Sequence, residues 1–368
     1  ALEVSMGGPS ITEGDVEEVT RVLRSGRLRE GPLCRKFEEE FASKVGSKFA
    51  VSLSSGTAAL QVAYLILLKP GDEVLVPSFT FIATASMVAL SGATPVFCDV
   101  DAKTFTLDLG DARKRITSRT RAIAPVHLFG NCCDIPGVRA MAGRNNLRIV
   151  WDAAQAHGAR SGGADVGSFG DLVCYSFYAS KNMTTGEGGM ITTSDPEIFE
   201  KCARMRDHGQ TGANLHTSLG FNYRMTDMQA ALGLSQLKRL DSLVGRRREN
   251  AGFLDEGLRE VEGITPPHVP DGVEHSYNQY SILLAGEQAK ERREEFRDQL
   301  RERGIETAVY YSRPLHLQPV FAERPQPHLP VSEDLSDRIV SLPVHPGLRA
   351  EDLRRITGAV REEMPVKL

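Results

Sequence analysis

The stretch LVCYSFYASK, residues 172–181, begins as a short apolar segment and ends in a lysine within a loop. Residues 172–176 have the length and apolar character of a buried strand. Five more segments of this kind precede it, at residues 49–53, 73–76, 95–98, 122–126 and 147–151. Helical stretches separate several of them, including residues 82–90 and 135–144. This alternation predicts an α/β fold in which helices cover both faces of a mostly parallel sheet, as a three-layer sandwich.

The N-terminal part of the chain carries two helix signals. Thr12 and Asp15 resemble a capping box, and apolar residues at helical spacing follow until Gly26. A second helix is expected over residues 32–45. After the strand at residues 49–53, the turn Ser54-Ser55-Gly56-Thr57 opens a helix rich in alanine and leucine. A unit of strand, tight turn and helix is therefore expected here.

The character of the chain changes after Thr226, where we expect a long amphipathic helix that runs to about residue 260. A stretch with proline and glycine follows it. The rest of the chain predicts strands at residues 278–284 and 306–310, and helices at residues 287–303 and 351–363. We therefore predict a large domain over residues 1–240 and a smaller α+β domain over residues 241–368.

Composition and charge are those of an ordinary globular protein. The chain has 368 residues, 41% hydrophobic and 25% charged, and its formal net charge of -4 gives no reason to expect a nucleic-acid partner. No apolar run approaches the roughly 20 residues needed to cross a bilayer, so we expect no membrane partner and a cytoplasmic location. The six cysteines are scattered without CxxC spacing and indicate reduced thiols. No HExxH pattern or Cys/His cluster predicts a metal site.

Lys181 lies in a loop rich in glycine, serine and threonine. A lysine is usually a solvated surface charge, but no helix face or charge pair explains this one. Asp152 follows an apolar strand directly, so its carboxylate either caps a helix that starts at Ala153 or binds a ligand. Pyridoxal 5′-phosphate (PLP) requires such a set of groups. An amine forms a Schiff base with its aldehyde, and a carboxylate keeps its pyridine nitrogen protonated.

A phosphate site is predicted where residues 54–58, Ser-Ser-Gly-Thr-Ala, lead from a strand into a helix. Free backbone N–H groups and the helix dipole converge at such a place. Serine-rich helix caps are common, so this motif alone is a weak signal, but Ser176 supplies a second hydroxyl for a phosphate. Gln155 lies on the turn after Asp152 and could touch the cofactor's ring oxygen, whereas His157 is interpreted as structural.

Four motifs together resemble those of the PLP-dependent nucleotide-sugar aminotransferases of the DegT/DnrJ/StrS family, a branch of the aspartate-aminotransferase fold type. The motifs are Ser55-Gly56-Thr57-Ala58-Ala59-Leu60, Trp151-Asp152-Ala153-Ala154-Gln155-Ala156-His157-Gly158, the lysine loop through Gly189, and Gly220-Phe221-Asn222-Tyr223-Arg224-Met225. The resemblance covers nearly the whole chain. Many relatives have His-Pro where this chain has Tyr178-Ala179, which leaves the spacing from Ser176 to Lys181 unchanged.

The resemblance implies which residues contact the cofactor ring. Lys181 would carry the cofactor as a Schiff base, and Asp152 would pair with the pyridine nitrogen. Gln155 would lie near the ring oxygen, and Phe81 would stack on the ring.

The resemblance also implies a shared phosphate site. Thr57, Ala58 and Ser176 would hold the phosphate from one subunit. Asn222 would reach it from the other subunit, so that a homodimer would share its active sites. Three further residues match a loop that approaches the sugar nucleotide, although a packed strand end would look the same: Tyr310, Tyr311 and His316.

The activity implied by the resemblance is a ping-pong transamination. L-Glutamate would give its amino group to the cofactor, and a keto-sugar linked to a nucleotide would then accept it. Relatives that dehydrate sugars have histidine in place of the lysine, and Lys181 argues against that subgroup. Two alternatives stay open on the same fold. One is an amino-acid aminotransferase or PLP lyase, which needs an arginine for the substrate carboxylate, and the other is a regulatory protein without catalysis.

Overall fold

A seven-stranded sheet forms the centre of the protein in the computed structural model, which describes residues 3–286 and 288–364. Its strands are β1 Phe49–Leu53, β2 Glu73–Pro77, β3 Thr94–Cys98, β4 Thr120–Ile123, β5 Arg148–Asp152, β8 Leu172–Ser176 and β9 Gly189–Thr193. They lie in the order β1-β9-β8-β5-β4-β2-β3. β9 is antiparallel to both of its neighbours, and the pairs from β8 to β3 are parallel. The prediction of a mostly parallel sheet is confirmed.

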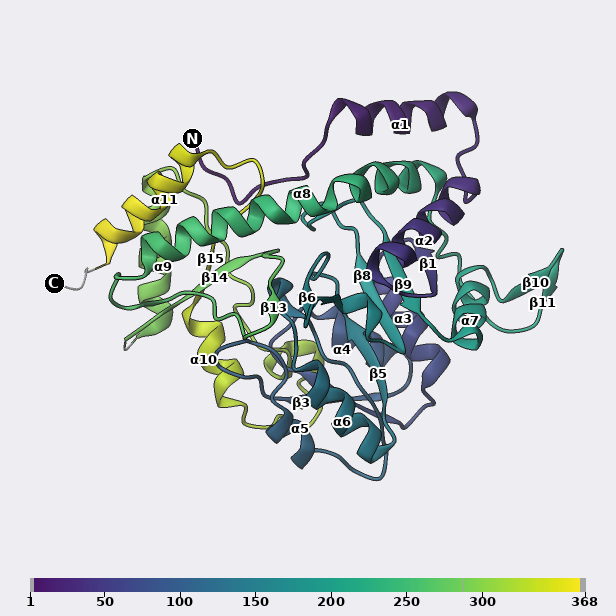
Figure 1. Ribbon diagram of the computed structural model, residues 1–368. Coiled ribbons are helices and arrows are strands. Elements are labelled where there is room, and N and C mark those ends of the chain that lie inside the picture. The colour runs from purple at the N-terminus through teal and green to yellow at the C-terminus, as the bar shows by residue number, and fades with distance from the viewer. Residues whose placement is uncertain (1–2, 287, 365–368) are drawn as a thin grey trace.

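Helices cover both faces of this sheet, as the ribbon in Figure 1 shows. They are α2 Pro32–Val45, α3 Gly56–Leu67, α4 Ala83–Leu90, α5 Leu109–Lys114, α6 Ile135–Asn145, α7 Pro196–Arg206 and α8 Asp227–Leu258. Successive residues of a strand point to opposite faces. Trp151 and Val173 accordingly pack in the core beneath α2, α6 and α8. Their neighbours Val150 and Leu172 pack in the core beneath α3, α4 and α7. The three-layer arrangement is confirmed.

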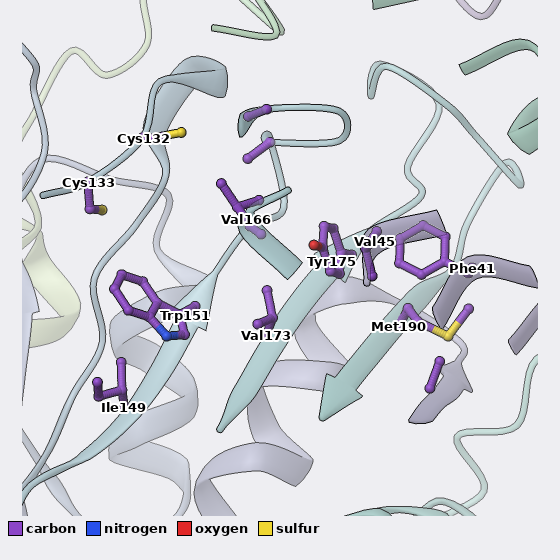
Figure 2. Packing of buried hydrophobic residues seen from close by; sticks show 14 of the residues in the cluster. Phe41, Val45, Cys132, Cys133, Ile149, Trp151, Val166, Val173, Tyr175 and Met190 are labelled. Atoms are coloured by element: carbon purple, nitrogen blue, oxygen red, sulfur yellow. The ribbon is translucent and has the colours of Figure 1, made fainter. Parts of the chain in front are cut away.

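The first of these cores combines aromatic and aliphatic side chains from distant parts of the sequence. Figure 2 shows Trp151 and Tyr175 on adjacent strands, with Phe41 of α2 packed nearby. The rings of Phe41 and Tyr175 meet edge to face with centroids 5.0 Å apart. This packing fixes where β5 and β8 end, and therefore where the residues that follow these strands lie.

The helix signals at the N-terminus are confirmed. α1 spans Glu13–Ser25, and Thr12 and Asp15 form a reciprocal capping box. Gly26 ends the helix in the left-handed conformation, with φ 68°. α3 begins at Gly56, and the hydroxyl of Ser55 caps it by accepting a hydrogen bond from the N–H of Ala58 (3.0 Å). The polar residues before α1 and α3 therefore satisfy backbone donors that these helices leave free.

The C-terminal part of the chain forms a separate core on the other half of α8. A small sheet of β12 Ile264–Thr265, β14 Tyr280–Leu284 and β15 Ile339–Leu342 packs with α9 Ala289–Glu302, α10 Pro330–Arg338 and α11 Ala350–Glu363. Leu237 of α8 contributes to the large core, whereas Leu254 contributes to the C-terminal core. The predicted domain boundary at residues 240/241 falls inside this continuous helix and stays a prediction. Val4 also packs in the C-terminal core.

Short elements complete the structure. They are β6 Arg160–Ser161, β7 Ala164–Asp165, β10 Gln210–Gly212, β11 Leu215–His216, β13 Val273–Glu274, and the 3-10 turns η1 Leu128–Gly130, η2 Val166–Ser168, η3 Leu315–Leu317 and η4 Pro319–Phe321. The β10–β11 hairpin projects from the body of the protein (Figure 1). No helix among residues 3–286 and 288–364 combines the length and apolar character of a transmembrane span.

One predicted strand is wrong. Residues 306–310 form no strand, because their backbone groups pair with two different segments. Glu306 donates its N–H to Val4, whereas Ala308 exchanges hydrogen bonds with Ser341 as an isolated bridge. The predicted strand at residues 278–284 begins at Tyr280. The predicted start of a helix at residue 287 lies outside the described residues, and α9 begins at Ala289.

Candidate active site

A cavity of about 590 Å³ opens beyond the carboxyl ends of the parallel strands. Segments that follow β2, β4, β5 and β8 line it, together with the first turn of α3 and two segments of the C-terminal part. Ligands bind at this edge of open α/β sheets. Eight of the predicted site residues line the cavity: Thr57, Phe81, Asp152, Gln155, Ser176, Lys181, Tyr310 and Tyr311.

Lys181 lies in the loop that follows β8, five residues beyond Ser176. Its N–H donates to the carbonyl of Tyr178 (2.9 Å), which closes a tight turn. Burial lowers the pKa of the Lys181 amine to about 8, against the opposing effect of the Asp152 charge. Because a desolvated amine loses its proton more easily, part of the Lys181 population is a neutral nucleophile near neutral pH.

Asp152 is the last residue of β5 and is buried. One carboxylate oxygen accepts a hydrogen bond from the N–H of Ala154 (3.1 Å), and the other accepts one from the hydroxyl of Thr84 (2.8 Å). Burial raises the pKa of the Asp152 carboxyl, whereas these two hydrogen bonds and the charge of Lys181 oppose that rise. No helix begins at Ala153, where the chain forms turns, so the interpretation of Asp152 as a helix cap is wrong.

The first turn of α3 forms a cradle beside Ser176. A Cβ atom placed on Gly56 would lie 2.7 Å from the Cβ of Ser176, so only glycine permits this close approach. The amides at the start of a helix have no partner within the helix and suit an anion. The hydroxyl of Ser176 accepts a hydrogen bond from the N–H of Tyr178 (3.3 Å), which leaves its own proton for another acceptor. These donors fit a phosphate group.

Aromatic rings and one amide form another part of the wall. Phe81 is 54% exposed, although it is a large apolar side chain, and its ring centroid lies 6.3 Å from that of Tyr311. The side-chain carbonyl of Gln155 accepts a hydrogen bond from the N–H of Phe129 (2.7 Å). The side-chain nitrogen of Gln155 donates to the hydroxyl of Tyr311 (3.1 Å).

Three predicted site residues lie outside this lining. Ala58 is buried, and its N–H already donates to Ser55. Asn222 is exposed and lies in a backbone bridge with Asp207.

His316 is buried too. Its ring bonds to the hydroxyl of Ser78 (2.7 Å) and to the carboxylate of Glu333 (3.2 Å). The structure therefore gives the His316 ring two protein partners away from the cavity.

Two residues that support the site show no functional pattern in the sequence, namely Thr84 beside Asp152 and Asn278 on the cavity wall. Thr84 lies within α4 and reaches Asp152 across the sheet edge. Asn278 donates to the carbonyl of Ser180 (3.4 Å) and so supports the lysine loop from the C-terminal part of the chain. Asn278 stands at the start of a predicted strand, and its position beside the loop depends on long-range packing. His157 is buried between Tyr175 and Phe177, as expected of a structural residue.

The charge of the cavity is sparse. Lys181 is the one basic side chain among the described residues that line it, and Asp152 and Glu187 are the acidic ones. Most of the other polar lining groups are neutral hydroxyls and amides of serine, threonine, tyrosine, asparagine and glutamine. Within residues 3–286 and 288–364 no group of three or more His, Cys, Asp or Glu side chains could hold a metal ion.

The chain is similar to known proteins over nearly its whole length. The model of the DegT/DnrJ/EryC1/StrS aminotransferase family matches residues 9–361. A UDP-N-acetyl-3-dehydro-alpha-D-glucosamine 3-aminotransferase of Acidithiobacillus ferrooxidans is 41% identical over 348 residues, which is 94% of this chain and 92% of the relative.

Two solved structures are similar over almost the whole chain. S. venezuelae DesV, solved with a ketimine intermediate, has a TM-score of 0.90 at 39% identity and covers 95% of this chain and 93% of its own. Streptococcus pneumoniae Spr1654 in its PLP form has a TM-score of 0.91 at 32% identity, with 97% of each chain covered.

Proposed function

The chain belongs to the DegT/DnrJ/EryC1/StrS aminotransferase family, and we propose that it transfers an amino group from L-glutamate to a nucleotide-linked keto-sugar in two ping-pong half-reactions, with PLP as cofactor. The family and its relatives make the protein an aminotransferase of the sugar aminotransferase type. The observation that carries the proposal is the half-buried side chain of Lys181, whose amine has its pKa lowered to about 8 by desolvation, in one cavity with the carboxylate of Asp152.

The residues of the cavity fit PLP in kind. The amides at the start of α3 and the hydroxyl of Ser176 would hold its phosphate, and Asp152 would hold its protonated ring nitrogen. Phe81 would cover the ring, because its exposed face needs an apolar partner. When bound, PLP supplies an aldehyde that condenses with amines and a ring that withdraws electrons from the carbon next to the nitrogen.

In this proposal Lys181 moves protons. Its Nζ accepts the proton from the α-carbon of glutamate and later returns a proton to the sugar carbon that receives the amino group. A general base works best when its pKa lies near the operating pH, and the pKa of about 8 meets that condition. Asp152 would stay ionised beside a protonated ring nitrogen, because that positive charge would oppose the rise of its pKa on burial.

The neutral polar lining supports a sugar as the amino acceptor. Sugar hydroxyls bind to hydroxyl and amide groups, and these make up most of the polar lining. The described lining has no arginine, so a partner subunit or backbone N–H groups would bind the carboxylates of the donor glutamate in the proposed enzyme.

We propose that the active unit is a homodimer with shared sites. Asn222 is exposed outside its own cavity, so it is available to a second copy. α1 adds apolar side chains that face solvent in a single chain, among them Val16 (48% exposed) and Leu23 (53% exposed). A second copy would cover such side chains.

The experiment that tests the proposed function follows nitrogen from donor to acceptor. The PLP-loaded protein is incubated with ¹⁵N-labelled L-glutamate and, in turn, UDP-, GDP- and dTDP-linked keto-sugars, and the sugar products are analysed by mass spectrometry. We expect ¹⁵N in one class of amino sugar and stoichiometric 2-oxoglutarate. Lys181→Ala should abolish transfer. Lys201→Ala is the matched control, because this lysine lies on the exposed side of α7 in a pair with Glu197.

Transfer of nitrogen to free keto acids alone would favour the amino-acid aminotransferase. Failure of the protein to take up PLP would favour a regulatory protein without catalysis.

A further inference from the structure

The amide of Gln155 is held at both ends in a defined orientation. Its carbonyl oxygen accepts the N–H of Phe129 at 2.7 Å, and a backbone N–H can act only as a donor. This contact fixes which end of the amide is oxygen, so the other end is the nitrogen. That nitrogen lies 3.1 Å from the hydroxyl oxygen of Tyr311.

The side-chain amide of Gln155 has more hydrogen-bonding groups than these two contacts use. A side-chain amide has two N–H donors and an oxygen with two acceptor positions. Tyr311 takes one donor, and Phe129 takes one acceptor position. One N–H of Gln155 therefore remains, and Gln155 lines the cavity. The orientation of this remaining donor is limited by the two contacts that hold the amide.

Tyr311 reaches Gln155 from the C-terminal part of the chain and is itself held by packing. Its ring lies 6.0 Å from Phe79 and 6.3 Å from Phe81, between centroids. Phe79 is fully buried, whereas Phe81 faces the cavity. The Tyr311 hydroxyl is therefore a fixed acceptor, and its contact joins two segments that are 156 residues apart.

We propose that Tyr311 is a positioning residue. It acts through Gln155, and it holds the remaining N–H of that amide ready for the ring oxygen of PLP. This inference rests on the proposed function, because it assumes that PLP binds in the cavity. It assigns the Tyr311 hydroxyl to the cofactor side of the site and gives it no contact with the sugar.

The proposal has a spectroscopic consequence. A hydrogen-bond donor to the ring oxygen of PLP withdraws negative charge from that oxygen. This charge would otherwise stabilise a proton on the nitrogen that joins Lys181 to the cofactor. A weaker donor therefore lets that nitrogen keep its proton to higher pH. In Tyr311→Phe the midpoint of the visible absorption change of the PLP-loaded protein should rise by roughly 0.5–1 pH unit, the size expected for one hydrogen bond.

The experiment titrates the visible absorption of PLP-loaded wild type, Tyr311→Phe, Gln155→Met and the double variant from acid to alkaline pH. Phenylalanine keeps the ring that packs on Phe79 and Phe81. Gln155→Met tests the same link from its other side, so the proposal stays testable even if Tyr311→Phe folds poorly. We expect the double variant to shift no further than Gln155→Met alone, because Tyr311 acts through Gln155. Tyr280→Phe is the matched control and should leave the midpoint unchanged, because its hydroxyl bonds to Asp255 away from the cavity.

Two results would overturn the proposal. One is an unchanged midpoint in Tyr311→Phe together with a higher KM for the sugar, which would make Tyr311 a substrate contact. The other is additive shifts in the double variant, which would mean that Tyr311 acts independently of Gln155. Wild-type protein that takes up no PLP would instead refute the proposed function, and this inference with it.

Discussion

Burial shifts the pKa values of Lys181 and Asp152 in opposite directions, and the charge of each side chain opposes the shift of the other. Burial lowers the pKa of the lysine and raises the pKa of the aspartate, because both charged forms lose water. The negative charge of Asp152 favours the protonated lysine, and the positive charge of Lys181 favours the ionised aspartate. The positive charge of a bound pyridinium would keep Asp152 ionised in place of the Lys181 charge. Lys181 would then lose its proton more easily and act as a nucleophile or a base.

The capture of PLP by the apo protein should therefore depend on pH in a defined direction. The neutral amine is the nucleophile, so the capture rate should rise with pH and reach half of its maximum near the pKa of about 8. Asp152→Asn removes the charge that favours the protonated lysine, so its half-maximum should move to lower pH. Its turnover with glutamate should fall on the order of 10²-fold, because the ring nitrogen loses its counter-charge.

Stopped-flow absorbance at a series of pH values measures the capture rate. A half-maximum that stays in place or moves to higher pH in Asp152→Asn would contradict the coupling between the two side chains.

A second prediction concerns the hydroxyl of Thr84. Thr84→Val keeps the shape of the side chain but removes the hydroxyl that bonds to Asp152. The carboxyl of Asp152 should then ionise less readily, so PLP affinity should fall roughly 2- to 10-fold, the effect of one hydrogen bond. Thr84→Ser keeps the hydroxyl and should preserve the affinity. Fluorescence titration with PLP measures the affinity of both variants. An equal loss of PLP affinity in the two variants would mean that Thr84 acts through packing and not through its hydroxyl.

Site residues could be predicted where a sequence motif and its chemistry agree. The prediction failed for residues whose contacts are long-range. Lys181, Asp152 and Ser176 follow strands whose carboxyl ends share one edge, and that rule brings them into one cavity. Thr84 lies on a helix whose sequence shows no functional pattern, and its role depends on how α4 packs against α3, β2 and β3. His316 matches a motif in sequence, but its ring is bonded to Ser78 and Glu333.

At the scale of elements, the first turn of α3 decides whether a phosphate fits. Gly56→Ala would place a Cβ atom 2.7 Å from that of Ser176. We expect the variant to lose about 1–3 kcal/mol of unfolding free energy through overpacking, together with PLP affinity. Gly143→Ala is the matched control, because Gly143 lies inside α6 with no atom within 4 Å of the added Cβ.

Gly143→Ala should stabilise the protein by up to about 1 kcal/mol, since alanine is the better helix former. Chemical denaturation of both apo proteins measures the two changes. Equal stability of Gly56→Ala and wild type would contradict the tight approach of α3 to Ser176.

The strands were predicted correctly where the flanking helices bury both faces of the segment. The strands of the central sheet are short and apolar because helices cover both of their faces, so they are visible in the sequence. Residues 306–310 look similar, but their hydrogen bonds go to Val4 on one side and to Ser341 on the other. Pairing of this kind depends on where distant segments end, and a local pattern does not encode it.

At the scale of the whole molecule, α8 ties the two cores together. Leu237 packs in the large core and Leu254 in the C-terminal core, so one rigid element spans both (Figure 1). The cavity draws on both parts of the chain, through Lys181 on one side and Tyr311 on the other. The relative placement of the two parts therefore determines the geometry of the site.

A shared active site predicts complementation between inactive variants. Lys181→Ala and Asn222→Ala should each be inactive or nearly so. When the two proteins are unfolded, mixed in equal amounts and refolded, half of the dimers should contain one of each chain. One of the two sites in such a dimer has both wild-type residues, so we expect roughly a quarter of wild-type activity. Mixed samples that stay as inactive as their components would refute the assignment of Asn222 to the partner's site.

The most direct measurement of the central claim is the position of the cofactor on the chain. The PLP-loaded protein is reduced with borohydride, which makes the link between amine and cofactor permanent, then digested and analysed by mass spectrometry. We predict that the pyridoxyl group is found on Lys181, that wild-type protein loses activity in step with labelling, and that Lys181→Ala takes no label. A label on another lysine, or a Lys181→Ala variant that still transfers amino groups, would contradict the claim.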